Sequence, residues 1–168
     1  SVVTEREYSI GSIGIRGGSG GISVRDVWLE DKQGERIRSL TRDTPASLCL
    51  DADVGANFVG RSDVEVAFSI NTLEGHRLFT VISSWTNDQL MIKSPRMSIA
   101  CDLPGIPLAP GRYLVDATVI FHGDTLDCVQ HCAMFEVLPL NQGFHVGRLA
   151  EHGVLDLRCQ FRQRRDPG

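Results

Sequence analysis

Apolar residues recur at every second position in several short segments of the chain. The segment 111–121 shows this most clearly, with apolar side chains at Tyr113, Val115, Ala117, Val119 and Phe121. A period of two is typical of a β-strand with one face on a core and the other face open. Pro110 and Gly111 precede the run as a turn signal. The segment therefore predicts a half-buried strand that the chain enters from a loop.

The same alternation marks further strands along the chain, with turn signals between them. These segments are 22–29, 48–54, 64–70, 79–81, 97–101, 129–137 and 155–161. Between Val24 and Val27 the apolar positions change face, which indicates a β-bulge. No segment shows a convincing helical period. We therefore predict an all-β fold, an immunoglobulin-like antiparallel β-sandwich of about eight or nine strands.

Composition divides the 168 residues into three predicted regions. Residues 1–21 end in GSIGIRGGSGG, and this glycine-rich run predicts a flexible linker or lead-in. Residues 22–161 form the predicted sandwich domain, which is long enough to bury a core of its own. Residues 162–168, RQRRDPG, form a short basic tail that we expect to be solvated.

Charge and cysteine content exclude several classes of function. The net charge of −4 argues against a nucleic-acid binder, which needs a basic surface. The odd number of cysteines predicts reduced, structural thiols in a cytosolic protein. They are Cys49, Cys101, Cys128, Cys132 and Cys159. Cysteines four residues apart on a strand lie about 13 Å apart, too far to share a tetrahedral ion. We therefore expect neither a metal site nor a cofactor.

The order of four segments resembles a known family. These segments are VWLEDKQGER, LCLDADV, INTLEGHRLFTV and IPLAPGRYLVDATV. Their order and spacing resemble the C-terminal domain of Wzt-type proteins, the ATP-binding subunits of ABC transporters that export O-antigen polysaccharide. The resemblance covers roughly residues 22–161. It implies an immunoglobulin-like sandwich that binds the exported glycan at its non-reducing end. The chain contains no Walker motif, so we expect the ATPase to belong to the rest of the parent subunit.

Sugar binding needs flat aromatic rings and planar hydrogen-bonding groups, and residues out of phase with the predicted core supply both. The candidate glycan-binding residues are Trp28, Thr80, Trp85, Asn87, Arg112, Asp116, Thr118 and Gln130. Several have a plainer interpretation: Trp85 caps the core, Trp28 covers a sheet edge or a dimer contact, and Arg112 pairs with Asp116. His131 shares the phase of Phe135 and is expected at the edge of the core.

Two functions of different classes fit the sequence. The first is a non-catalytic domain that recognises O-antigen polysaccharide, and the alternative is a structural or protein-interaction immunoglobulin-like domain without glycan binding. An enzyme is not expected, because a glycosidase needs two paired carboxylates and no motif brings Glu65 and Asp116 together. The resemblance further implies a cytoplasmic location, at the inner membrane through the parent transporter.

A homodimer is also expected, with exchange of the last strand as one arrangement. The long hinge 138–152 precedes a strand whose inward residues need burial in one sheet or the other. Those residues are Leu155, Leu157, Cys159 and Phe161.

Overall fold

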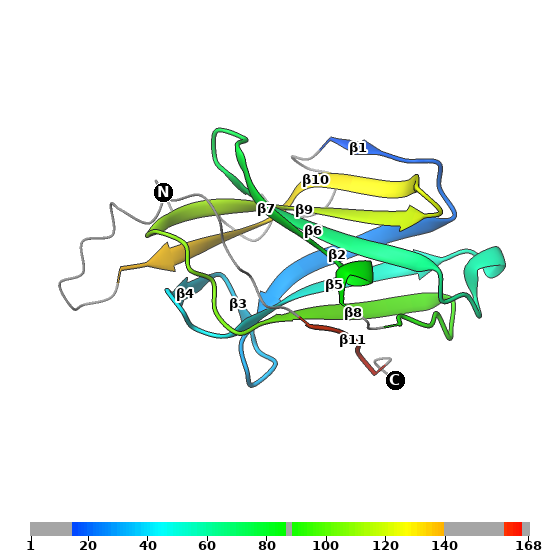
Figure 1. Ribbon diagram of the computed structural model, residues 1–168, viewed down its shortest axis with the longest axis horizontal. Helices are drawn as coiled ribbons and strands as arrows, with labels where there is room; N and C mark the ends of the chain where they lie inside the picture. The colour runs from blue at the N-terminus through cyan, green and yellow to red at the C-terminus, as the bar shows by residue number, and fades with distance from the viewer. Residues whose placement is uncertain (1–14, 87–88, 140–159, 166–168) are drawn as a thin grey trace.

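Two β-sheets pack face to face in the computed structural model, which describes residues 15–86, 89–139 and 160–165 (Figure 1). Sheet A contains β1 (Arg16–Gly17), β4 (Ser39–Thr41), β6 (Val64–Thr72), β7 (Arg77–Ile82), β9 (Gly111–Phe121) and β10 (Asp124–Leu138). Sheet B contains β2 (Ile22–Glu30), β3 (Arg36–Ile37), β5 (Ala46–Val54), β8 (Arg96–Leu103) and β11 (Gln160–Gln163). This architecture confirms the predicted all-β sandwich. Among the described residues, eight strands have at least four residues, and β1, β3 and β4 are shorter.

The strand order is β1-β10-β9-β6-β7 in sheet A, with β4 also on β10, and β11-β8-β5-β2-β3 in sheet B. All pairings are antiparallel except the parallel pairing of β4 with β10. The predicted bulge in β2 is confirmed by a register shift between Val24 and Asp26. Two short 3₁₀ turns, η2 (Ala56–Phe58) and η3 (Ser83–Trp85), follow β5 and β7.

One continuous apolar core lies between the sheets. The inward residues of β6, including Phe68 and Ile70, are fully buried in the same cluster as Leu48 and Leu50 of β5. Phe161 of β11 is 2% exposed, and its ring stacks on Phe68 with centroids 6.3 Å apart. The alternating pattern in the sequence thus places one face of each long strand in the core.

Tyr113 explains why a turn precedes the strand β9. Its ring is buried and packs against Phe135, with centroids 5.6 Å apart. Its hydroxyl donates a hydrogen bond of 2.6 Å to the carbonyl oxygen of Ala109. Because the chain bends at Pro110 just before β9 begins, the tyrosine hydroxyl can reach back to the backbone upstream. Such a tyrosine corner is a feature of immunoglobulin-like sandwiches.

The predicted lead-in is corrected at its C-terminal end, because β1 pairs with Cys128 and Val129 of β10. Gly18 lies so close to β10 that a Cβ atom there would be 2.3 Å from the Leu126 carbonyl oxygen. The backbone N–H of Gly20 then donates to that same oxygen at 2.8 Å. Gly18 is therefore needed because only glycine allows the two backbones to come this close. It does not make this part of the chain a flexible linker, as the composition had suggested.

A buried carboxylate on β10 binds both the edge strand β1 and sheet B. Asp127 of β10 is 5% exposed and accepts bonds of 3.0 and 2.5 Å from Nε and Nη2 of Arg16. The same carboxylate accepts a bond of 2.7 Å from the backbone N–H of Val24, on β2 of sheet B. Asp127 therefore links an edge of sheet A to an edge of sheet B.

The C-terminal strand extends further than expected. Gln160 to Gln163 pair with β8, so Arg162 and Gln163 belong to the sheet and not to a solvated tail. The buried position of Phe161 confirms its predicted inward orientation. The predicted inward residues Leu155, Leu157 and Cys159 lie outside the described residues.

The alternation predicted for 129–137 is interrupted within β10. Its pairing with β9 shifts register between Val129 and Ala133, and His131 adopts a φ of 54° within this irregular stretch. Cys132 and Ala133 are consequently both buried, although they are neighbours in the strand. His131, expected at the core edge, is half-buried, and its backbone N–H bonds to the Asp116 carboxylate on the outer face of sheet A.

Replacing Phe161 tests how β11 is anchored. We expect Phe161→Ala to lower the free energy of unfolding by about 3–5 kcal/mol, because it removes a buried ring and leaves a cavity beside Phe68. Chemical denaturation followed by circular dichroism measures the change. The exposed Arg165→Ala is the control and should change stability by less than about 0.5 kcal/mol. Equal midpoints for the two variants would show that Phe161 does not anchor the strand.

Candidate functional site

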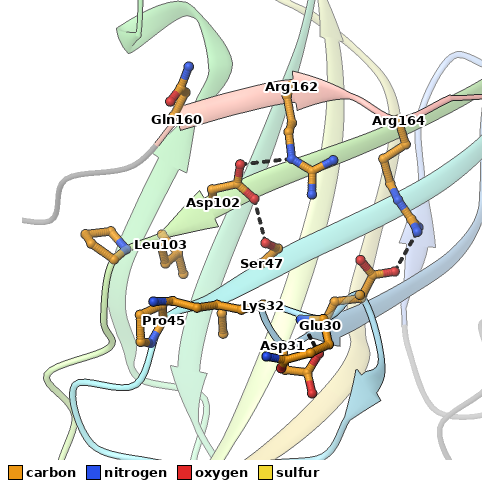
Figure 2. A pocket seen from close by; sticks show the side chains of 14 residues that line it. Glu30, Asp31, Lys32, Pro45, Ser47, Asp102, Leu103, Gln160, Arg162 and Arg164 are labelled. Atoms are coloured by element: carbon orange, nitrogen blue, oxygen red, sulfur yellow. Dashed lines mark hydrogen bonds and ion pairs between the residues drawn. The ribbon is translucent and has the colours of Figure 1, made fainter.

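A cleft of about 800 Å³ opens at one end of sheet B. Its walls come from the end of β2 and the β2–β3 hairpin, the start of β5, the end of β8, and β11 (Figure 2). Its main polar side chains are Glu30, Asp31, Lys32, Ser47, Asp102 and Arg162. Leu103, Pro45 and Pro104 supply an apolar side. A cavity of this size with convergent polar groups is typical of a small-molecule site.

The polar groups of the cleft form one row across the outer face of sheet B. The strand registers place Gln160 opposite Asp102, Asp102 opposite Ser47, and Ser47 opposite Glu30. Asp102 accepts a bond of 2.5 Å from the Ser47 hydroxyl and one of 2.9 Å from Arg162 Nε. Successive residues of a strand point to opposite faces of the sheet, so the neighbours of core residues point outward. The strand registers bring these outward polar residues side by side in one row.

Trp28 lies on the same outer face, in the next row. It packs on Cys49 and Ala100, and it is only 7% exposed. The guanidinium groups of Arg36 and Arg164 cover its ring at 4.1 and 5.1 Å from the centroid. Trp28 thus points away from the main core, as expected, but it is covered by arginines and does not present a free face to a sugar.

A buried ion pair supports the floor of the cleft. Glu30 is 4% exposed and accepts bonds from Trp28 Nε1 at 2.9 Å and from Arg164 Nη2 at 2.7 Å. Figure 2 shows Arg164, which directly follows β11, extending to Glu30. Burial, reinforced by the charge of Glu30, raises the pKa of the Cys49 thiol to about 12. Cys49 is therefore a protonated packing group and not a reactive thiolate.

Three predicted glycan-binding residues do gather on the outer face of sheet A. Ser69 pairs with both Thr80 and Asp116 in the strand registers, and Thr118 lies two positions beyond Asp116 on β9. Asp116, however, is 7% exposed and accepts bonds from Asn71 Nδ2 at 2.9 Å and the His131 N–H at 2.7 Å. Its ion-pair partner, at 3.6 Å, is Arg77 and not the expected Arg112. Asp116 is thus occupied by the protein's own donors.

The remaining predicted residues are dispersed. Trp85 is 70% exposed in η3, and Arg112 is exposed opposite Glu136 on β10. The Thr118 hydroxyl contacts Cys128 Sγ at 3.4 Å, and the backbone N–H of Gln130 bonds to the Ile15 carbonyl. Asn87 lies outside the described residues. None of the seven predicted residues that the structure describes lines the cleft.

A second hollow of about 550 Å³ lies at the start of β6. Ser84 and Thr86, which flank Trp85 in the chain, line it together with Asp63, Glu65 and His122. Bonds from Arg61 and His122 hold the pKa of the Asp63 carboxyl well below its usual range. Because both chain neighbours of Trp85 line this hollow, it is the polar cavity to which the exposed Trp85 is most closely connected.

The sequence contains only weak indications that the cleft residues belong to a site. Glu30, Ser47 and Asp102 are out of phase with core residues, but each stands near a strand end, where polar residues are common. Arg162 and Arg164 fell in the region interpreted as a tail. Which polar residues of different strands lie side by side depends on the register between the strands. The periodicity of a single strand does not contain this register.

The described residues contain neither a metal-binding cluster nor a membrane-spanning helix. Among them, no group of three or more His, Cys, Asp or Glu residues is placed to hold a metal ion. Within the same residues, no helix has the length and apolar character required to cross a membrane.

The fold and the cleft define a two-sheet β-sandwich domain with a polar cleft at one sheet end. A family model described as the Wzt C-terminal domain matches residues 14–157, so the chain belongs to this family. A solved structure described as the crystal structure of the C-terminal domain of wzt is similar, with a TM-score of 0.66 and 18% identity. The match covers 84% of this chain and 96% of that one. No curated protein matches the chain. The matched family confirms the resemblance, associates the domain with an ABC transporter, and indicates no catalytic family.

Arg162 in β11 and Arg164 just after it should differ in their effect on stability. We expect Arg164→Ala to lower the free energy of unfolding by about 1–3 kcal/mol, because the buried Glu30 carboxylate loses a charged donor. Arg162→Ala breaks a half-exposed pair and should cost only about 0–1 kcal/mol. Denaturant titration with Trp fluorescence measures both. Equal effects of the two substitutions would contradict the role given to Glu30.

Proposed function

We propose that this domain is a non-catalytic glycan-binding module that recognises an O-antigen polysaccharide, at its non-reducing end, for export by an ABC transporter. Through its parent subunit it acts on the cytoplasmic side of the inner membrane. Membership of the Wzt C-terminal domain family supports the association with a transporter. The observation that carries the binding role is the large cleft with its row of hydrogen-bonding side chains.

The cleft suits binding better than the other surfaces of the described residues. On the outer face of sheet A, Asp116 is already saturated by internal donors. In the cleft, Asp102 and Arg162 keep 38% and 49% of their side-chain surface exposed while they hold each other in place. Groups that are both accessible and fixed lose little freedom when a ligand binds, which favours recognition. The hollow near Trp85 is smaller, about 550 Å³ against about 800 Å³ for the cleft.

Binding to polysaccharide tests the proposal directly. We expect the protein to bind O polysaccharide purified from its own source organism, with weak to moderate affinity, in isothermal titration calorimetry. Arg162→Ala should weaken binding at least tenfold, and the incubated polysaccharide should release no reducing sugar. Trp85→Ala is the matched comparison: an effect confined to this variant would move the site to the second hollow. Absence of any binding would favour the alternative, a protein-interaction domain.

We also propose that the domain forms a homodimer. Exchange of β11 between protomers would retain the β8–β11 pairing and the burial of Phe161, because either copy presents the same groove. We expect light scattering of the full chain to give the mass of two chains. Deleting residues 153–168 should abolish the dimer or cause aggregation, since the groove beside Phe68 would be exposed. A deletion variant that stays folded and dimeric would contradict this role of the strand.

A further inference from the structure

The side chains of the cleft are balanced in charge and in hydrogen-bonding type. Three cationic residues line it, Lys32, Arg162 and Arg164, together with three anionic residues, Glu30, Asp31 and Asp102. Arg164 and Glu30 neutralise each other in the floor at 2.7 Å, and Arg162 and Asp102 do so in the wall at 2.9 Å. A cleft that bound an anion would need an excess of cations, and one that bound a cation would need the reverse.

From this balance we infer that the cleft binds an uncharged sugar unit through a pair of neighbouring hydroxyl groups, and that it rejects acidic sugars. The inference rests on the proposed glycan-binding function and names the class of sugar at the same site. Its geometric basis is the Asp102–Arg162 pair, which presents an acceptor and a donor side by side toward the cleft (Figure 2).

A hydroxyl group both donates and accepts hydrogen bonds, and a carboxylate or phosphate only accepts. One hydroxyl of a vicinal diol can donate to Asp102, while its neighbour accepts from the guanidinium of Arg162. Arg162 uses Nε for Asp102, and no described residue is paired with its Nη groups. Lys32 has no ion-pair partner among the described residues either, and Figure 2 shows its side chain along the cleft toward Pro45. Donors and acceptors are thus both available.

An anionic ligand would meet carboxylates on two sides of the cleft. Asp102 lies in the row at one side and Asp31 at the β2–β3 hairpin on the other. Asp31 is fixed there because its Oδ1 accepts the backbone N–H groups of Gln33 and Glu35, both at 2.9 Å. Lys32 and the Nη groups of Arg162 attract an anion, but Asp31 and Asp102 offset this attraction. An anionic group also cannot donate the hydrogen bond that Asp102 accepts from a hydroxyl, so an acidic sugar binds more weakly than a neutral one.

Chemical modification of one polysaccharide tests both parts of the inference. The probe is O polysaccharide from the source organism in three forms. The first is native, the second is cleaved at its vicinal diols by periodate and reduced, and the third is oxidised at its primary hydroxyls to carboxylates. In calorimetry we expect the second and third forms to bind at least tenfold more weakly than the native form.

Variants separate charge from shape. Asp102→Asn retains an acceptor for Ser47 but removes one negative charge, so it should reduce discrimination against the carboxylated form at least threefold. The exposed Glu136→Gln on sheet A is the charge-matched control and should leave all affinities unchanged. The inference is overturned if the carboxylated or periodate-treated form binds as tightly as the native one, or if the native ligand proves to be an acidic sugar. If no form binds at all, the proposed function itself fails, whereas normal binding by Asp102→Asn and Arg162→Ala refutes only the location in the cleft.

Discussion

Burial of Phe161 is the interaction on which the functional end of the molecule depends. The ring fills the core beside Phe68, and this burial holds a strand of only four residues at the edge of sheet B. Because neighbouring side chains of a strand point to opposite faces, the buried ring turns Gln160 and Arg162 outward, toward the cleft. The hydrophobic contact inside the sandwich thereby positions the polar groups outside it.

The outer face of sheet B shows how a small domain combines a rigid support with an accessible site. Trp28, Cys49 and Ala100 form a second, smaller apolar cluster beneath two arginines. This cluster holds the Glu30–Arg164 pair out of water, and the pair is further fixed by the indole N–H of Trp28. The adjoining Asp102–Arg162 pair is half-exposed. One ion pair is thus structural and its neighbour is available to a ligand, although their arginines, Arg162 and Arg164, are only two residues apart in the chain.

Sequence periodicity was sufficient for the architecture and for most of the core. The strands β5, β6, β8 and β9 lie where alternation placed them, and the β2 bulge follows from the change of face after Val24. The candidate site was not predictable in the same way. Periodicity identified Trp28 and Asp116 as outward residues, but it contains no information on the arginines and amides that cover them. Gly18 and Arg162 were misread because composition suggested a linker and a tail, whereas long-range pairing with β10 and β8 decides their structure.

The coverage of β10 has a consequence for how this domain associates with others. Its outer edge is paired at two places, with β1 at Cys128 and Val129 and with β4 from Glu136 to Leu138. Unpaired edge strands are templates on which other chains add and aggregate. These two short strands cover parts of that edge of sheet A, so they oppose edge-to-edge association of one domain with another. Five residues thus cover parts of the edge through which a continuous intermolecular sheet could otherwise grow from the longest strand described.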